Sequence, residues 1–199
     1  MTCYVAVSPT DSARTVVGLL HTRSVRMSVE ASDFKAALAR FPSGVTVITV
    51  VDTDAPPGEQ DHGMTASAFC SLSLDPPLIL VCVKKGNATH DKLTRASGFG
   101  VNILAADQVS VSNRFAGWWK EGVSKWADLE LSRGAESGAP LIGGALARLD
   151  CRKFKALDGG DHTIFIGEVH GAEVSAADGA DPEPLLYFFG GYRTIGAAP

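Results

Sequence analysis

The sequence predicts a mainly β protein whose strands form a closed barrel. Six or seven short apolar stretches, rich in β-branched residues, follow one another at close spacing. Turn signals made of glycine, proline and aspartate separate them. Helical patterns are few, so the regular alternation of strand and helix that builds a doubly wound parallel sheet is missing. A barrel with a few short helices at its flanks is therefore the expected fold.

At 199 residues the chain has the size of one domain, which we place at 28–199 after a poorly ordered N-terminal extension at 1–27. The first element is a short amphipathic helix with Ser32 as its candidate N-cap and Pro42 at its end. Its apolar face is formed by Phe34, Leu38 and Phe41. The next stretch, 45–52, is apolar on both faces, which predicts a strand covered on both sides.

The rest of the chain is read in the same way. The middle elements, in order, are a turn region at 53–63, strands at 64–71 and 78–83, a polar loop at 84–88, a helix capped by Thr89 that ends at Arg95, a strand at 98–104 and a helix from Asp107. The stretch 118–140 is irregular, with three tryptophans as anchors. Strands at 146–156, 162–174 and 185–192 close the chain, and the sequence DGG at 158–160 predicts a hairpin turn.

Composition excludes several classes of protein. Hydrophobic residues make up 45% and charged residues 20% of the chain, which predicts a folded protein. The net charge of −4 argues against a protein that binds the nucleic-acid backbone, although a few local donors are enough to bind a nucleotide. No apolar run approaches the roughly 20 residues needed to cross a bilayer, so we expect no membrane segment.

The cysteines and histidines point to neither a disulfide scaffold nor a metal centre. The four cysteines form no CxxC pair, which fits a reduced, cytoplasmic setting. The five histidines show no HExxH or similar ligand spacing, so no metal site is expected. The Rossmann motif GxGxxG, the P-loop and the GxSxG nucleophile elbow are also missing from the sequence.

The first candidate site is the strand of small residues in GMTASAFCSLS. Thr65, Ala66, Ser67 and Ala68 have little bulk, so a flat ligand can approach their backbone and hydrogen-bond to it. Small residues equally suit a strand against which a helix packs closely. The composition leaves both interpretations open.

The second candidate is the polar loop KKGNATH that follows the strand at 78–83. Lys84, Lys85, Asn87 and Thr89, together with the first amides of the following helix, form an anion site whose donors suit a phosphate. The alternative is a solvated loop with an ordinary threonine cap.

The third candidate is His162, which begins a strand after Gly159, Gly160 and Asp161. A histidine at the end of a turn commonly satisfies a free backbone group. The two glycines, however, allow a ligand to come close, and Asp161 can tune the imidazole. The residues alone leave both roles open.

Five motifs in order carry a resemblance to a known family: FPSGVTVITV, GMTASAFCSLSLDPPLILVCV, FGVNIL with DQ two residues later, GDH at 160–162, and PLLYFFGGY. From Phe34 to Ile195 the chain resembles the flavin reductase family, the small reductase components of two-component flavin-dependent monooxygenases. The GDH motif makes the chain resemble the branch of this family that has the sequence GDH at the corresponding position. The resemblance implies a split β-barrel of Greek-key type with a few short flanking helices.

The resemblance also implies roles for the candidate residues. Those beside the flavin ring are Thr65, Ala66, Ser67 and Ala68. Those beside the ribityl chain are Cys82, Val83 and Lys84. Asn87 and Thr89 match the loop that contacts the phosphate, although the family more often has Ser where this chain has Asn87. His162 matches a histidine near the nicotinamide, and Tyr192 lies near the ring or the dimer interface.

The implied activity is hydride transfer from NADH or NADPH to FMN or FAD, by a cytoplasmic homodimer that supplies reduced flavin to a partner monooxygenase. This fits the residues, because the two cofactors carry the chemistry and the protein has only to stack two flat rings. One alternative is a non-catalytic flavin carrier or redox-sensing flavoprotein on the same fold. Another is a split-barrel oxidase of amines, which predicts a pocket rich in Arg and Tyr that the sequence does not signal.

Overall fold

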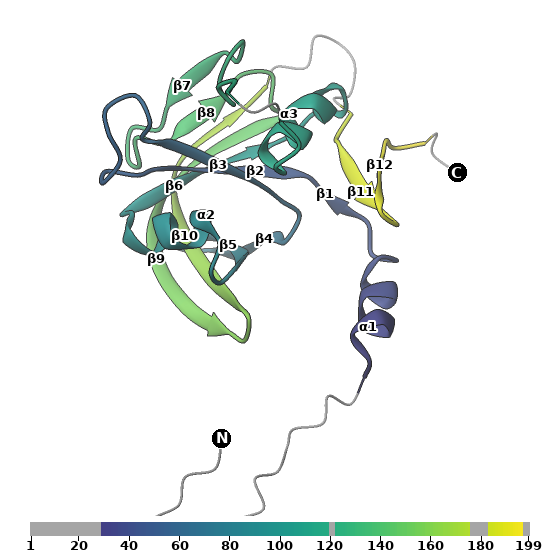
Figure 1. Cartoon of the computed structure of the whole chain (residues 1–199). Coiled ribbons are helices and arrows are strands. Elements are labelled where there is room, and N and C mark those ends of the chain that lie inside the picture. The colour runs from purple at the N-terminus through teal and green to yellow at the C-terminus, as the bar shows by residue number, and fades with distance from the viewer. Residues whose placement is uncertain (1–28, 120–121, 176–182, 197–199) are drawn as a thin grey trace, which may run out of the picture.

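The structure is a computed structural model that describes residues 29–119, 122–175 and 183–196. Its main feature is a seven-stranded antiparallel sheet in the order β3-β2-β6-β9-β10-β5-β4, which coils round a core (Figure 1). The strands of this sheet are β2 (Thr46–Val51), β3 (Asp61–Ala66), β4 (Phe69–Leu74), β5 (Pro77–Lys84), β6 (Gly98–Ile103), β9 (Ala147–Gly159) and β10 (His162–Val174). The expected mainly β fold is confirmed.

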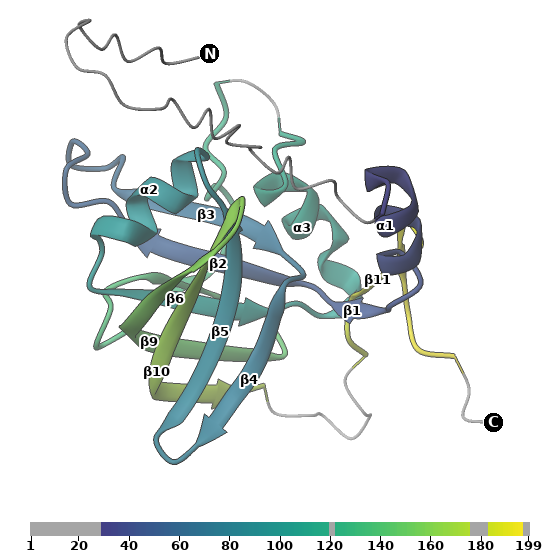
Figure 2. The same cartoon turned by 90° about the horizontal axis from the view of Figure 1, so that it is seen from below.

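The two edge strands of this sheet, β3 and β4, follow each other in the chain. Only Ser67 and Ala68 join them, so the edges meet at this corner. The corner is fixed on both sides: the Thr46 hydroxyl donates to the Ala66 carbonyl at 2.7 Å, and the Cys82 amide donates to the Ala68 carbonyl at 2.9 Å. Away from the corner, the described parts of β3 and β4 share no backbone ladder. The sheet is therefore a barrel split between β3 and β4, seen from below in Figure 2.

The sequence of β2 explains why the sheet can carry structure on both faces. Its alternate side chains Ile48 and Val50 belong to the core inside the barrel, together with Phe99, Val101 and Phe165. Its other alternate side chain, Val47, packs outward in a second apolar cluster. That second cluster also contains Val45, Leu104, Val111, Phe115, Ile142 and Leu185. The predicted strand with two covered faces is confirmed.

Short helices lie around the barrel. They are α1 (Ala31–Leu38), α2 (Ala88–Arg95), the 3₁₀ turn η1 (Ala106–Gln108) and α3 (Val109–Phe115). Two predicted caps were wrong. Glu30, without a side-chain bond, stands at the N-cap position of α1 in place of Ser32. Asn87 caps α2, because its side chain accepts a hydrogen bond from the His90 amide at 2.7 Å. Thr89 is the second residue of the helix and is buried.

Three strand predictions also need correction. The segment at 64–71 is two strands, because the chain changes its pairing partner at the Ser67–Ala68 corner. The segment at 185–192 is a hairpin of β11 (Leu186–Phe188) and β12 (Gly191–Arg193), and β11 also pairs with β1 (Ser43–Gly44). The stretch 118–140, expected to be irregular, contains β7 (Leu131–Arg133), which pairs with β8 (Pro140–Ile142) at the end of the stretch.

The expected N-terminal extension at 1–27 lies outside the described residues. None of the described helices has the length and apolar character required to span a membrane. Three of the four cysteines are described, and all three are free thiols.

Candidate functional site

A cavity of about 630 Å³ opens beside the corner where β3 ends. This volume is in the range of small-molecule sites. It is lined by Val45, Met64, Thr65, Ser67, Ser112, Asn113, Phe115, Ala116, Trp118, Tyr187, Gly190, Gly191 and Tyr192. Three of the sequence-predicted residues, Thr65, Ser67 and Tyr192, are therefore brought together. We call this space the corner cavity.

The polar wall of the corner cavity is held by hydrogen bonds between distant parts of the chain. The Thr65 hydroxyl donates to the Ser112 carbonyl at 2.6 Å. The Tyr192 hydroxyl donates to the Asn113 side-chain oxygen at 2.9 Å and is 2.9 Å from the Ser112 hydroxyl. Tyr187 packs edge-on against the Tyr192 ring. Flat rings and fixed polar groups in one wall suit a planar heterocycle with polar edges.

The neighbours of Thr65 and Ser67 in the predicted segment face elsewhere. Ala66 is 8% exposed and packs in the core inside the barrel, while Ala68 is exposed at the corner itself. Small side chains at both positions let the chain turn sharply from β3 to β4. Ala66 thus faces the core, whereas Thr65 and Ser67 line the corner cavity. That this cavity binds a ligand stays a prediction.

The polar loop before α2 lies alongside the same strand. The Asn87 side-chain nitrogen is 3.7 Å from the Met64 sulfur, and Met64 also lines the corner cavity. Thr89 is buried, with its hydroxyl 2.8 Å from Nε2 of His62. On the other side of the helix, Nε2 of His90 is 2.9 Å from the Thr163 hydroxyl. The first turn of α2 is thus fixed between β3 and β10.

His162 lies at the end of the β9–β10 hairpin, opposite Lys84 in the ladder between β10 and β5. Its Nδ1 is 2.7 Å from the Asp161 carboxylate, and this hydrogen bond holds the pKa of Asp161 below its usual value. The His162 side chain is 41% exposed, so its ring is accessible. Lys85 contacts Asp158 and donates to the Gly160 carbonyl at 2.6 Å, which ties the loop to the hairpin.

The three predicted site residues at the end of β5 differ in exposure. Val83 is fully buried in the core, whereas Lys84 is exposed. Cys82 is half-buried, and burial raises the pKa of its thiol. Of these three residues only Lys84 and Cys82 offer side chains to a ligand; Val83 can contribute only its backbone.

Several residues of the site were missed from the sequence. Met64, Ser112, Asn113 and Tyr187 line the corner cavity, and His62 holds Thr89. Ser112 and Asn113 lie in a short helix without any chemical motif, so no sequence signal marked them. Within the described ranges no cluster of three or more potential metal ligands is found.

We compared the chain with known families, proteins and structures. The family model described as "Flavin reductase like domain" matches residues 38–196. The chain belongs to this family. It is 42% identical over 154 residues to an NADH-dependent FAD reductase of Streptomyces globisporus, covering 77% of this chain and 79% of the relative. It is 43% identical over 162 residues to the reductase component of 4-hydroxyphenylacetate 3-monooxygenase of Thermus thermophilus, covering 81% and 95%.

Solved structures agree with the family. The NADH:FAD oxidoreductase SgcE6 of Streptomyces globisporus C-1027 matches with a TM-score of 0.74 at 38% identity, over 86% of this chain and 98% of that one. BorF, the flavin reductase component of a bacterial two-component tryptophan halogenase, matches with a TM-score of 0.72 at 38% identity, over 85% and 100%. The predicted resemblance and the split-barrel fold are thereby confirmed.

The geometry around His62 yields a prediction about pH. Burial, followed by the charges of Lys92 and Lys125, lowers the pKa of His62 to about 4. An unfolded chain has a histidine pKa of about 6.5, so between these values the unfolded state binds a proton that the folded state does not. We expect His62 to reduce stability as the pH falls from about 6.5 to about 4. The His62→Gln variant, compared by melting temperature across this range, should lose less than the wild type.

An NMR titration of the His62 ring gives a direct check. A midpoint near the ordinary histidine value would contradict the prediction. So would equal pH dependence of the melting temperature in the wild type and the variant.

Proposed function

We propose that this protein is an NAD(P)H:flavin oxidoreductase, which transfers a hydride from NADH or NADPH to FMN or FAD and supplies reduced flavin to a partner monooxygenase. The observation that carries the proposal is the corner cavity at the end of β3, with the first turn of α2 beside Met64, in a chain of the flavin reductase family. The accessible His162 lies at the end of the β9–β10 hairpin, opposite Lys84 of β5. NADH is the expected donor, since the names of several relatives specify NADH.

The corner cavity supplies a place for the flavin ring. The Thr65 hydroxyl donates its proton to Ser112, so its oxygen can accept from the N–H group of the pyrimidine edge of a flavin. Ser67 is exposed at the cavity wall and can donate. When bound, the flavin supplies the hydride acceptor, and the protein's task is to fix its orientation against the nicotinamide.

The loop before α2 supplies a place for the phosphate. The Asn87 oxygen caps the helix, which leaves its amide nitrogen as a donor beside Met64. Lys84 adds a positive charge close by, at the end of β5. Thr89 contributes differently from the role first expected, because its hydroxyl already contacts His62 and is buried. Asn87, Lys84 and the first amides of α2 are the groups we assign to the phosphate.

We assign the accessible ring of His162 to the nicotinamide. Asp161 contacts this ring through Nδ1, which leaves Nε2 as the ring nitrogen that we assign to the ligand. This role separates a reductase from a flavin carrier on the same fold. A carrier needs the corner cavity and α2 but has no use for a histidine that positions the hydride donor.

The first test therefore combines activity with His162→Ala. Purified protein is expected to oxidise NADH with either FMN or FAD, and the variant to lose about tenfold or more in kcat/KM for NADH. Its dissociation constant for flavin should stay within about twofold of the wild-type value. His170→Ala, on the same strand and remote from the hairpin, is the matched control. No NADH or NADPH oxidation by a wild type that binds flavin would refute the reductase and favour the carrier. An unaffected variant would refute the role assigned to His162.

Asn87→Asp tests the phosphate loop. Aspartate keeps the oxygen that caps α2 but replaces the amide donor by a negative charge, which repels a phosphate. We expect the dissociation constant for FMN to rise about tenfold while that for riboflavin, which has no phosphate, stays the same. Fluorescence titration measures both ligands. Equal effects on FMN and riboflavin would show that Asn87 acts only on the helix.

We further propose that the protein is a cytoplasmic homodimer. Large apolar side chains are more than half exposed on the helix α1 and nearby: Phe34, Leu38, Phe41 and Phe189. A contiguous apolar surface of this kind commonly marks a protein interface. Light scattering should give twice the chain mass, and Leu38→Glu combined with Phe41→Glu should shift it toward the monomer, whereas Lys35→Glu on the same helix should not. A monomeric wild type would refute the homodimer.

A further inference from the structure

Trp118 lines the corner cavity with a side chain that is 80% exposed. Tryptophan is a large apolar residue and is highly buried on average. Where a large aromatic ring stays accessible beside a cavity, a ligand or a partner that covers it is the usual reason. In the corner cavity this ring is accessible to a bound flat ligand.

The other two tryptophans of the chain are anchored by contacts within the protein. Trp126 packs on Phe115, with 4.8 Å between the ring centroids, and Trp119 lies against the Arg114 guanidinium, which is 4.1 Å from its ring centroid. In both, Nε1 donates a hydrogen bond to a backbone carbonyl. Within the ranges that the structure describes, Trp118 has neither an aromatic or cationic partner nor a hydrogen bond from its Nε1. Its ring is therefore not needed to hold the described fold together.

The backbone of Trp118 is nevertheless fixed to the end of α3. The Ala116 amide donates to the Ser112 carbonyl at 2.9 Å, and the Trp118 amide donates to the Asn113 carbonyl at 3.0 Å. Between them Gly117 has a φ of +94°, the left-handed conformation that glycine commonly adopts at the end of a helix. Ser112 and Asn113 also belong to the polar wall of the corner cavity. Trp118 thus starts from a defined position relative to that wall.

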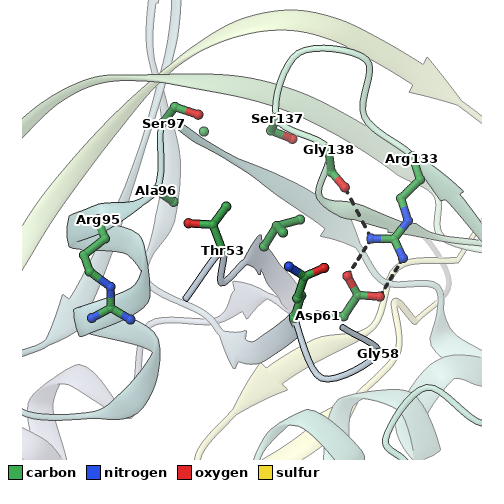
Figure 3. A pocket seen from close by; sticks show the side chains of 12 residues that line it. Thr53, Gly58, Asp61, Arg95, Ala96, Ser97, Arg133, Ser137 and Gly138 are labelled. Atoms are coloured by element: carbon green, nitrogen blue, oxygen red, sulfur yellow. Dashed lines mark hydrogen bonds and ion pairs between the residues drawn. The ribbon is translucent and has the colours of Figure 1, made fainter. Parts of the chain in front are cut away.

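A second cavity, of about 550 Å³, lies at the other end of β3 and differs in character (Figure 3). Its cations are paired: Arg133 forms hydrogen bonds of 2.5 and 2.7 Å with Asp61, and Arg95 is 2.9 Å from Asp54 and 3.2 Å from Asp52. None of the residues described as lining it is aromatic. A flat ring can stack on a tryptophan in the corner cavity but finds no aromatic partner at the other end of β3.

The two redox states of a flavin ring interact differently with an indole. The oxidised isoalloxazine is electron-poor, which is the property that lets it accept a hydride. The face of an indole ring is electron-rich, so the two rings attract each other when they are stacked. Reduction puts two more electrons into the flavin ring, which weakens this attraction.

We propose that Trp118 stacks on the oxidised isoalloxazine ring and makes the corner cavity bind oxidised flavin more tightly than reduced flavin. This rests on the proposed function, which places the flavin ring in the corner cavity. Trp118 then favours capture of the substrate form and release of the product form. The contact is to the ring alone, so riboflavin, FMN and FAD share it.

The test compares two variants of Trp118 with a matched control. Trp118→Ala removes the ring and Trp118→Phe keeps a smaller one; since the side chain is mostly exposed, the melting temperature should stay the same. Trp119→Phe is the control, because its ring lies against Arg114 and does not line the cavity. Fluorescence titration gives the dissociation constants for oxidised riboflavin, FMN and FAD, and, without oxygen, for reduced FMN. A reductive titration gives the midpoint potential of bound FMN.

We expect Trp118→Ala to raise the dissociation constants of all three oxidised flavins about tenfold, as the loss of an aromatic stacking partner does, and to leave that of reduced FMN unchanged. A tenfold loss of affinity for the oxidised form alone raises the midpoint potential of bound FMN by about 30 mV. Trp118→Phe should give intermediate values, and Trp119→Phe should match the wild type.

Unchanged binding of oxidised flavin by Trp118→Ala, or an equal loss for oxidised and reduced FMN, would overturn the inference. So would a loss confined to FMN and FAD, because riboflavin has the same ring, or an equal loss in the Trp119→Phe control. These measurements need no turnover. A wild type that binds flavin but oxidises neither NADH nor NADPH would therefore refute the proposed reductase and leave the role of Trp118 to be decided by binding.

Discussion

The structure depends on one short connection, the two residues Ser67 and Ala68 that join the edge strands of the coiled sheet. A sheet that closes completely pairs all its edges by hydrogen bonds. Here the edges meet only at this corner, which the Ala66 and Ala68 carbonyls secure through Thr46 and Cys82. Beyond the corner β3 is free to be covered by helices and loops. The two cavities and the helix α2 all lie against this one strand.

The fixed position of α2 follows from hydrogen bonds of ordinary strength. A neutral side-chain hydrogen bond contributes about 1 kcal/mol net, so His62 with Thr89 and His90 with Thr163 together stabilise the helix position modestly. The two hydrogen bonds hold the helix from two directions, because one comes from β3 and the other from β10. A helix held from two sides presents its first amides in a defined place before a ligand arrives, which lowers the entropy that binding has to overcome.

The sequence predicted much of the fold, but it did not reveal every contact that shapes the candidate site. β2 was readable because its apolar residues occupy both faces, and the hairpin before His162 because glycine marks the turn. The break at Ser67 was not readable, since small residues continue through it and only pairing with two different strands separates β3 from β4. The role of His62 was also not predictable from the sequence. Its partner Thr89 is 27 residues away, and the contact exists only because α2 packs on β3.

The polar side chains of the candidate site are hydrogen-bonded within the protein, which suits a ligand that binds reversibly. Thr65, Tyr192, Thr89 and His90 all have hydrogen-bond partners within the protein. In the described part of the chain, the single buried side-chain polar atom without a partner is Nε of Arg114, which lines neither cavity. A site whose buried donors depended on a ligand would lose the free energy of those bonds each time the ligand left. A reductase that releases its reduced flavin needs a site that stays stable without it, and these internal bonds provide that stability.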